Sequence, residues 1–139
     1  MNNTKTKIKA RHIIMPSGTY WVGDPCLFFR EHQWDQFLNE LLNSKRADES
    51  YYGRFDGHIF AASHTHQGDG YYEDNYGETY CIESGLLGCI KVVDKHGLWA
   101  GGTLGNDCLI EWLKPFTFKP ATSSNKYKIN IGCIEISTL

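Results

Sequence analysis

Two histidines, separated by one residue, are the side chains best suited to chemistry in this chain of 139 residues. If the strand that begins at His58 stays extended, His64 and His66 share one face, because side chains alternate along a strand. Their side chains would then lie about 7 Å apart and could converge on one divalent ion. Asp69, in the turn that follows, could add a carboxylate ligand. One hypothesis is therefore a metal-dependent hydrolase built on His64, His66 and nearby carboxylates.

The spacing around this histidine pair does not match an established metal motif. An H-x-H-x-D signature needs an acidic residue at position 68, where the chain has Gly68. A histidine pair on a half-exposed strand more often forms a polar face or a hydrogen-bonded pair. The sequence therefore favours a protein with no cofactor and no catalytic residues. The alternative is a divalent metal bound by His64, His66 and Asp69.

The stretch from His64 to Gly85 concentrates acidic and tyrosyl side chains between two predicted strands. Its tyrosines could form a stacking wall for a flat, nucleotide-like ligand, or could lie half-buried on a sheet face. A second segment, Gly23-Asp24-Pro25-Cys26, is typical of a turn in which proline holds the preceding residue extended. The candidate ligand-binding residues from both segments are Asp24, Asp69, Tyr72, Asp74, Tyr76, Tyr80, Glu83 and Ser84.

The cysteines give no sign of a redox motif. They are odd in number and form no C-x-x-C pair. Cys26 as a nucleophile would need a base and a lowered pKa, and the sequence places neither. Buried, reduced thiols are expected at Cys26, Cys81, Cys89, Cys108 and Cys133.

One helix and several strands must position these groups. Apolar residues at helical spacing predict an amphipathic helix over 31–45, with the stripe Trp34, Phe37, Leu38, Leu41 and Leu42. Short apolar runs between turn formers predict strands at Ile13–Met15, Thr19–Val22, Gly57–Ser63, Glu78–Ile82, Leu86–Val93, Cys108–Leu113 and Lys126–Ile136. In the last run the apolar positions change parity at Gly132, which predicts a β-bulge. Pro115 and Pro120 flank a stretch expected at a sheet edge or as a covering segment.

These elements predict an α+β fold that is mostly β. We expect a curved antiparallel sheet or small barrel with one amphipathic helix packed on it. The length suits a single domain over 1–139, in which residues 1–10 form a flexible or edge segment.

The net charge of −2 argues against a surface that tracks the phosphates of duplex nucleic acid. The sequence has no run of about 18 apolar residues and no apolar core near its amino terminus, so no membrane partner and a cytoplasmic location are expected. It does not indicate an oligomeric state.

Two motifs in the chain resemble a family of small uncharacterised proteins of tailed bacteriophages and some bacteria. The first is Val22-Gly23-Asp24-Pro25-Cys26 with a tryptophan-bearing helix at Trp34. The second is a Gly-Asp-Gly-x-Tyr-x-Asp segment from Gly68, followed by Ser84-Gly85, with Glu83 where the family usually has aspartate. The resemblance implies a phage context, a β-rich fold and action inside an infected cell.

The leading hypothesis is thus a phage-encoded binding protein that uses residues 64–85 and the loop 97–106. It would either inhibit a host protein, namely a host factor or a defence protein, or sequester a nucleotide-like ligand. The alternatives are the metal-dependent hydrolase and a virion or assembly component.

Overall fold

The computed structural model describes residues 13–29, 31–47, 49–92 and 109–139. The predicted amino-terminal segment 1–10, the loop 97–106 and Cys108 lie outside these residues. The strands are β1 (Ile13–Met15), β2 (Gly18–Gly23), β3 (Tyr51–Phe55), β4 (His58–His64), β5 (Gly70–Glu73), β6 (Thr79–Ile82), β7 (Leu86–Lys91), β8 (Leu109–Trp112), β9 (Phe116–Lys119), β10 (Lys128–Ile131) and β11 (Ile134–Ser137). The helices are α1 (Pro25–Phe28) and α2 (Glu31–Asn43), with a 3-10 turn at Ser123–Asn125.

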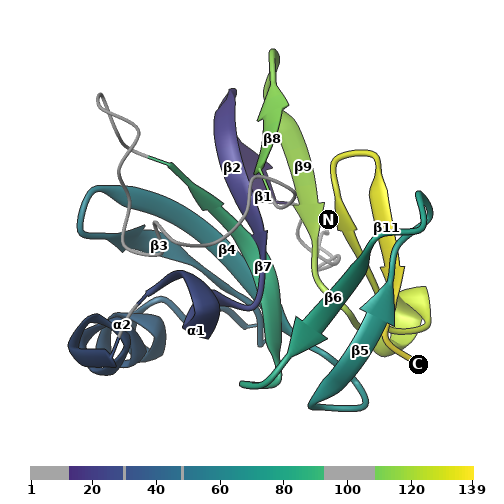
Figure 1. Cartoon of the computed structure of the whole chain (residues 1–139), viewed down its shortest axis with the longest axis horizontal. Helices are drawn as coiled ribbons and strands as arrows, with labels where there is room; N and C mark the ends of the chain where they lie inside the picture. The colour runs from purple at the N-terminus through teal and green to yellow at the C-terminus, as the bar shows by residue number, and fades with distance from the viewer. Residues whose placement is uncertain (1–12, 30, 48, 93–108) are drawn as a thin grey trace, which may run out of the picture.

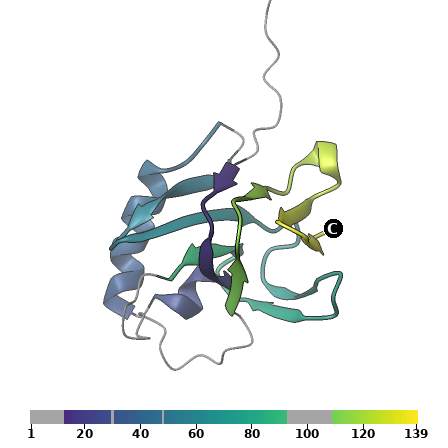
Figure 2. The ribbon, with the colours of Figure 1, turned by 90° about the horizontal axis from the view of Figure 1, so that it is seen from above.

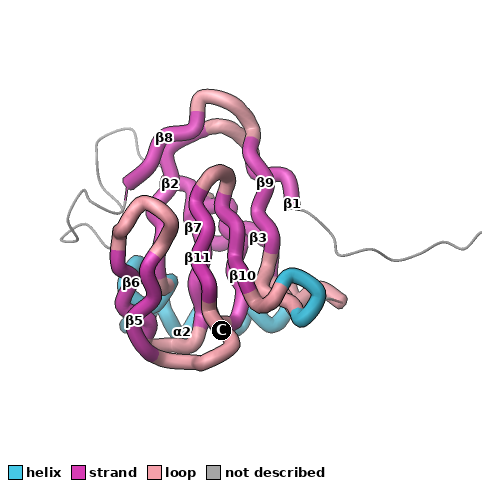
Figure 3. Tube along the Cα trace, turned by 90° about the vertical axis from the view of Figure 1, so that its right-hand side faces the viewer, coloured by secondary structure: helices cyan, strands magenta, loops and turns pink. Residues whose placement is uncertain are grey.

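The strands form antiparallel sheets, which confirms the predicted mostly β, α+β class. A five-stranded sheet has the order β3-β4-β7-β2-β8, and a four-stranded sheet has the order β1-β9-β10-β11. The β5–β6 hairpin lies beside β11 and joins it through a bridge between Asp74 and Ile136 (Figure 3). Among the described strands the sheets stay open, so the arrangement is the predicted curved sheet and not the small barrel.

Both faces of the five-stranded sheet are covered (Figures 1 and 2). On β2, Tyr20 and Val22 pack into a core shared with β5, β6 and the four-stranded sheet. Trp21 points to the opposite face and packs among α1, α2 and β4. Because neighbouring side chains on a strand point to opposite faces, a strand between two cores becomes apolar at nearly every position.

The helical layer differs from the prediction in two respects. The segment after Gly23 was predicted as a turn but continues into the one-turn helix α1. This helix forms because Asp24 caps its amino terminus and Pro25 occupies its first turn. In α2, Phe37 and Leu41 are buried as expected, but Leu38 and Leu42 are exposed. The helix therefore buries a narrower stripe than the sequence predicts.

The sheet corrects two further predictions. Gly132 does not form a bulge: it opens a two-residue turn between β10 and β11 and has a φ of 59°, so the chain reverses there. Chain reversal explains the parity change. The segment between Pro115 and Pro120 was expected at a sheet edge, but β9 lies between β1 and β10, because both prolines fall outside the paired residues.

Two strands were missed, β3 and β5. The expectation for the cysteines holds only in part. Cys89 is buried, Cys26 and Cys81 are half-buried, and Cys133 is exposed in the β10–β11 turn.

Candidate functional site

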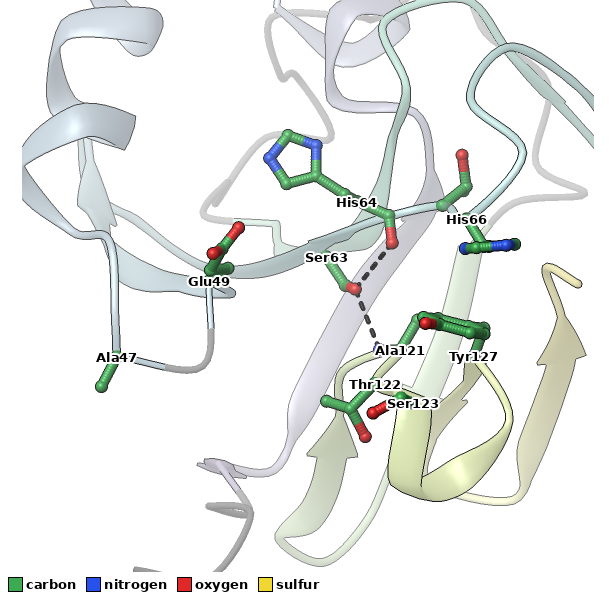
Figure 4. A pocket seen from close by; sticks show the side chains of 10 residues that line it. Ala47, Glu49, Ser63, His64, His66, Ala121, Thr122, Ser123 and Tyr127 are labelled. Carbon is green, nitrogen blue, oxygen red and sulfur yellow. Dashed lines mark hydrogen bonds between the residues drawn. The ribbon is translucent and has the colours of Figure 1, made fainter.

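A pocket of about 460 Å³, lined by polar and apolar groups in similar measure, lies where the end of β4 meets the segment before β10. Its volume falls within the range of small-molecule sites. We call it the β4 pocket and define it by Ala47, Glu49, Ser63, His64, Thr65, His66, Ala121, Thr122, Ser123 and Tyr127. Figure 4 shows Glu49 on one side and the rings of His66 and Tyr127 on the other.

The floor of the pocket is held together by Ser63. The Ser63 hydroxyl donates to the carbonyl oxygen of His64 at 2.9 Å and accepts from the backbone N–H of Ala121 at 3.0 Å (Figure 4). Ser63 is buried, and its bond to Ala121 joins β4 to a segment 58 residues later in the chain. Ser63 therefore ties together two of the segments that line the pocket.

His66 and Tyr127 form a stacked pair at one wall. Their ring centroids lie 3.9 Å apart with an interplanar angle of 21°. The fully buried Thr138 holds the two backbones: its hydroxyl accepts from the N–H of His66 at 3.0 Å and donates to the carbonyl of Tyr127 at 2.6 Å. The pair is thus positioned before any ligand arrives.

His64 is fixed by a different partner. Its Nε2 lies 2.8 Å from the Tyr51 hydroxyl, whichever of the two atoms carries the proton. Burial, and then the negative charge of Glu49, raise the pKa of the Tyr51 phenol. Tyr51 therefore remains a neutral hydrogen-bonding partner that holds the imidazole at the pocket.

Backbone strain is concentrated at this site. Of the four described non-glycine residues with positive φ, Glu49 (66°) and Tyr127 (59°) line the pocket, and Lys126 (59°) precedes Tyr127. Each such conformation costs of order 1–3 kcal/mol and persists only where surrounding contacts enforce it. Strain of this kind clusters at ligand sites.

The structure separates the predicted metal ligands. β4 ends at His64, and a turn closed by the bond from Gly68 N–H to the Thr65 carbonyl follows. The rings of His64 and His66 point in different directions, and Asp69 does not line the pocket (Figure 4). Across the described residues, no three His, Cys, Asp or Glu side chains are grouped so that they could hold a metal ion. The metal site stays a prediction to which this geometry adds no support.

The predicted ligand residues Asp24, Glu83 and Ser84 do meet, but as a structural junction. The Asp24 carboxylate is buried and accepts from the backbone N–H groups of Cys26, Glu83 and Ser84 and from the Ser84 hydroxyl, at 2.6–2.9 Å. These four bonds use the accepting capacity of the carboxylate. Asp24 therefore ties the start of α1 to the β6–β7 turn and leaves little for a ligand.

Cys26, next to this junction, is a poor nucleophile. Burial is the largest cause that raises its pKa to about 12, followed by the negative charge of Asp24. The thiolate is thus scarce near neutral pH. The sequence likewise placed no base and no lowered pKa at Cys26, although the thiol is half-buried and not buried as expected.

Three other predicted ligand residues build the β5–β6 hairpin. Asp74 is buried and accepts from the N–H groups of Tyr76 and Glu78 and from the Tyr80 hydroxyl. Tyr72 is buried, and its hydroxyl donates to the Gly68 carbonyl. These side chains pack and brace the hairpin, so Tyr72 and Tyr80 follow the alternative of tyrosines buried on a sheet face and not that of a stacking wall.

The exposed tyrosines of the hairpin are Tyr71 and Tyr76, at 77% and 63% relative exposure. Tyr76 lines a smaller cavity of about 260 Å³ with Asp74, Glu78, Tyr80, Ile110, Cys133 and Ile134. Tyr71 and Tyr76 are therefore free to contact a partner. Asp69 and Glu83 are also exposed.

Sequence reasoning found His64 and His66 but missed Glu49, Ser123 and Tyr127. These three come from other chain segments than the histidines, and only the packing of the five-stranded sheet against the four-stranded sheet brings all of them to one pocket. No motif marks them. The 3-10 turn that carries Ser123 is closed by Asn125, whose side chain accepts from the Thr122 N–H at 2.8 Å.

Comparisons with known proteins give no relative from which a function could be transferred. No protein-family model matches the chain, and neither a curated protein nor a solved structure matches it significantly. None of the described helices is long and apolar enough to span a membrane.

Proposed function

We propose that this chain is a small binding protein that holds a nucleotide-like ligand in the β4 pocket. The observation that carries the proposal is the His66–Tyr127 stack, fixed beside this cavity by the buried Thr138. Such preorganisation lowers the entropic cost of binding. A site whose rings and hydroxyls are held in place by hydrogen bonds to buried groups suits a binding role.

The resemblance to small phage proteins supports a setting for this activity. In that setting the protein acts in the cytoplasm of an infected host cell and sequesters a ligand that a host or defence system uses. Sequestration needs affinity and not catalysis, which agrees with a rigid pocket.

The proposal is tested by titrating the protein with a panel of nucleosides and nucleotides and monitoring its NMR chemical shifts. We expect shifts at His66 and Tyr127 and their loss in His66→Ala. Tyr71→Ala is the matched control, because it removes an exposed aromatic ring away from the pocket. A panel that leaves the pocket signals unmoved would overturn the proposal.

A second candidate is a basic host protein that docks on the outward face of the β5–β6 hairpin. Tyr71 and Glu73 are exposed there, while the alternate positions Tyr72 and Asp74 are buried. No Lys or Arg occurs between Gln67 and Ile90, so the surface suits a cationic partner. Binding that is lost in the double variant Tyr71→Ala, Glu73→Gln but kept in His66→Ala would favour this candidate over the pocket.

A further inference from the structure

We infer that the β4 pocket recognises the vicinal diol of an uncharged, hydroxyl-rich ligand and selects against a phosphate group. This inference rests on the proposed function and narrows its ligand class. A ribose in a nucleoside and a free hexose share the required chemistry. Glu49 is assigned to the diol, and the neutral groups on the facing wall are assigned to the rest of the ligand.

The charge of the lining argues against phosphate. Among the described residues that line the pocket, none is Lys or Arg, and Glu49 is the carboxylate. Phosphate sites in proteins usually supply arginine, lysine or a row of backbone N–H groups. A phosphate near Glu49 would instead meet a like charge, and this repulsion grows as the ligand displaces water.

Glu49 is placed to accept from hydroxyls. It is exposed, and it lies in a tight turn closed by its own N–H, which donates to the Arg46 carbonyl at 2.9 Å. The positive φ of this residue directs the chain so that the side chain lines the cavity opposite His66 (Figure 4). A carboxylate has two oxygens that accept in parallel, which matches two adjacent hydroxyl donors.

The facing wall supplies hydroxyl groups and an imidazole ring. Ser123 and Tyr127 bring hydroxyls that can both donate and accept, and His66 adds ring nitrogens. Groups of this kind can pair with further hydroxyls or with the polar edge of a base. A pocket that combines one carboxylate with neutral hydrogen-bonding groups therefore complements a neutral polyol.

Calorimetric titration of the full chain with four probes tests the inference: adenosine, adenosine 5′-monophosphate, 2′,3′-dideoxyadenosine and glucose. We expect adenosine or glucose to bind at least about tenfold more tightly than adenosine 5′-monophosphate. Dideoxyadenosine, which lacks the diol, should bind about tenfold more weakly than adenosine. Binding of adenosine identifies a nucleoside as the source of the diol, whereas binding of glucose alone would overturn the nucleotide-like ligand of the proposed function and keep the diol as the recognised group.

The variant Glu49→Gln should weaken binding of the diol ligand about tenfold and narrow its advantage over the monophosphate. Glu111→Gln is the matched control, since Glu111 is exposed on β8 and outside the pocket. Tighter binding of the monophosphate, or unchanged affinity in Glu49→Gln, would overturn the inference while leaving the proposed function intact. Failure of all four probes and of the wider nucleotide panel would remove both.

Discussion

The carboxylate of Asp24 accepts hydrogen bonds from both the backbone N–H and the hydroxyl of Ser84, 60 residues later in the chain, at 2.8 and 2.6 Å. The two residues belong to two separate sequence motifs, Val22–Cys26 and the segment from Gly68 to Gly85. Their contact links these motifs: one supplies a buried carboxylate, and the other supplies donors to it. The motifs therefore mark a fold-defining junction.

Removal of this carboxylate should destabilise the protein strongly. Asp24→Ala leaves the N–H groups of Cys26, Glu83 and Ser84 without their acceptor, which we expect to cost about 2–4 kcal/mol of unfolding free energy. Ser84→Ala removes only the hydroxyl bond and should cost about 1 kcal/mol. Urea denaturation measures both. A loss below 1 kcal/mol in Asp24→Ala would contradict the structural role.

The hairpin is braced by a bond between Tyr80 and Asp74. The Tyr80 hydroxyl donates to the Asp74 carboxylate at 2.7 Å, and both groups are buried. Tyr80→Phe should lower stability by about 1.5–3 kcal/mol, the usual value for a bond to a charged group. Tyr71→Phe, on the exposed face, should leave the urea midpoint unchanged. Equal effects of the two variants would argue against the brace.

Thr138 should control both stability and binding. Thr138→Val keeps the shape but loses the acceptor for the His66 N–H and the donor to the Tyr127 carbonyl. We expect a loss of about 1–3 kcal/mol and weaker binding at the β4 pocket, because the stacked rings lose their common anchor. Thr79→Val, at an exposed strand position, is the control. Ligand affinity that is insensitive to Thr138→Val would count against a preorganised pair.

Alkaline pH should weaken the fold partly through Cys26. Its pKa in the folded protein is about 12, compared with 9.0 for an ordinary thiol, because burial disfavours the thiolate. The folded state therefore keeps a proton that the unfolded state loses. This contribution to stability is complete below pH 9.0 and is lost as the pH rises toward about 12.

Urea midpoints measured between pH 8 and 11 should therefore fall less steeply in Cys26→Ala than in the parent chain. Cysteine alkylation gives an independent check. At pH 8 the exposed Cys133 should react before Cys26 and the buried Cys89. Rapid labelling of Cys26 in the native state would contradict the raised pKa.

Gly88 marks a close approach of β7 and β4. A Cβ at this position would overlap the carbonyl oxygen of Ala61, and both are backbone-fixed parts of the central sheet. Gly88→Ala should therefore cost about 3 kcal/mol or more, or prevent folding. Gly57→Ala is the comparison variant. Gly57 has a positive φ, but a Cβ there meets nothing within 4 Å, so this variant measures backbone strain without a clash. Circular dichroism during thermal unfolding compares the two.

The sequence by itself determined many of the local elements, but not β3, β5 or α1. The helix around Phe37 follows from the helical spacing of its apolar residues, and the strands around Tyr20 and Leu87 follow from short apolar runs between turn formers. The same local view failed at Gly132, where a change of parity fits either a bulge or a tight turn. It also failed at β9, since flanking prolines say nothing about which strands pair outside them.

Only the tertiary structure decided which polar groups serve folding and which face a cavity. Asp24 and Asp74 are candidate ligand residues in the sequence. In the fold, the carboxylate of each accepts hydrogen bonds from backbone N–H groups. Glu49 and Tyr127 carry no motif, but line the same pocket as the histidines because the fold packs distant segments from two sheets against each other. A carboxylate has the same chemistry in both settings, and burial and the available partners decide its role.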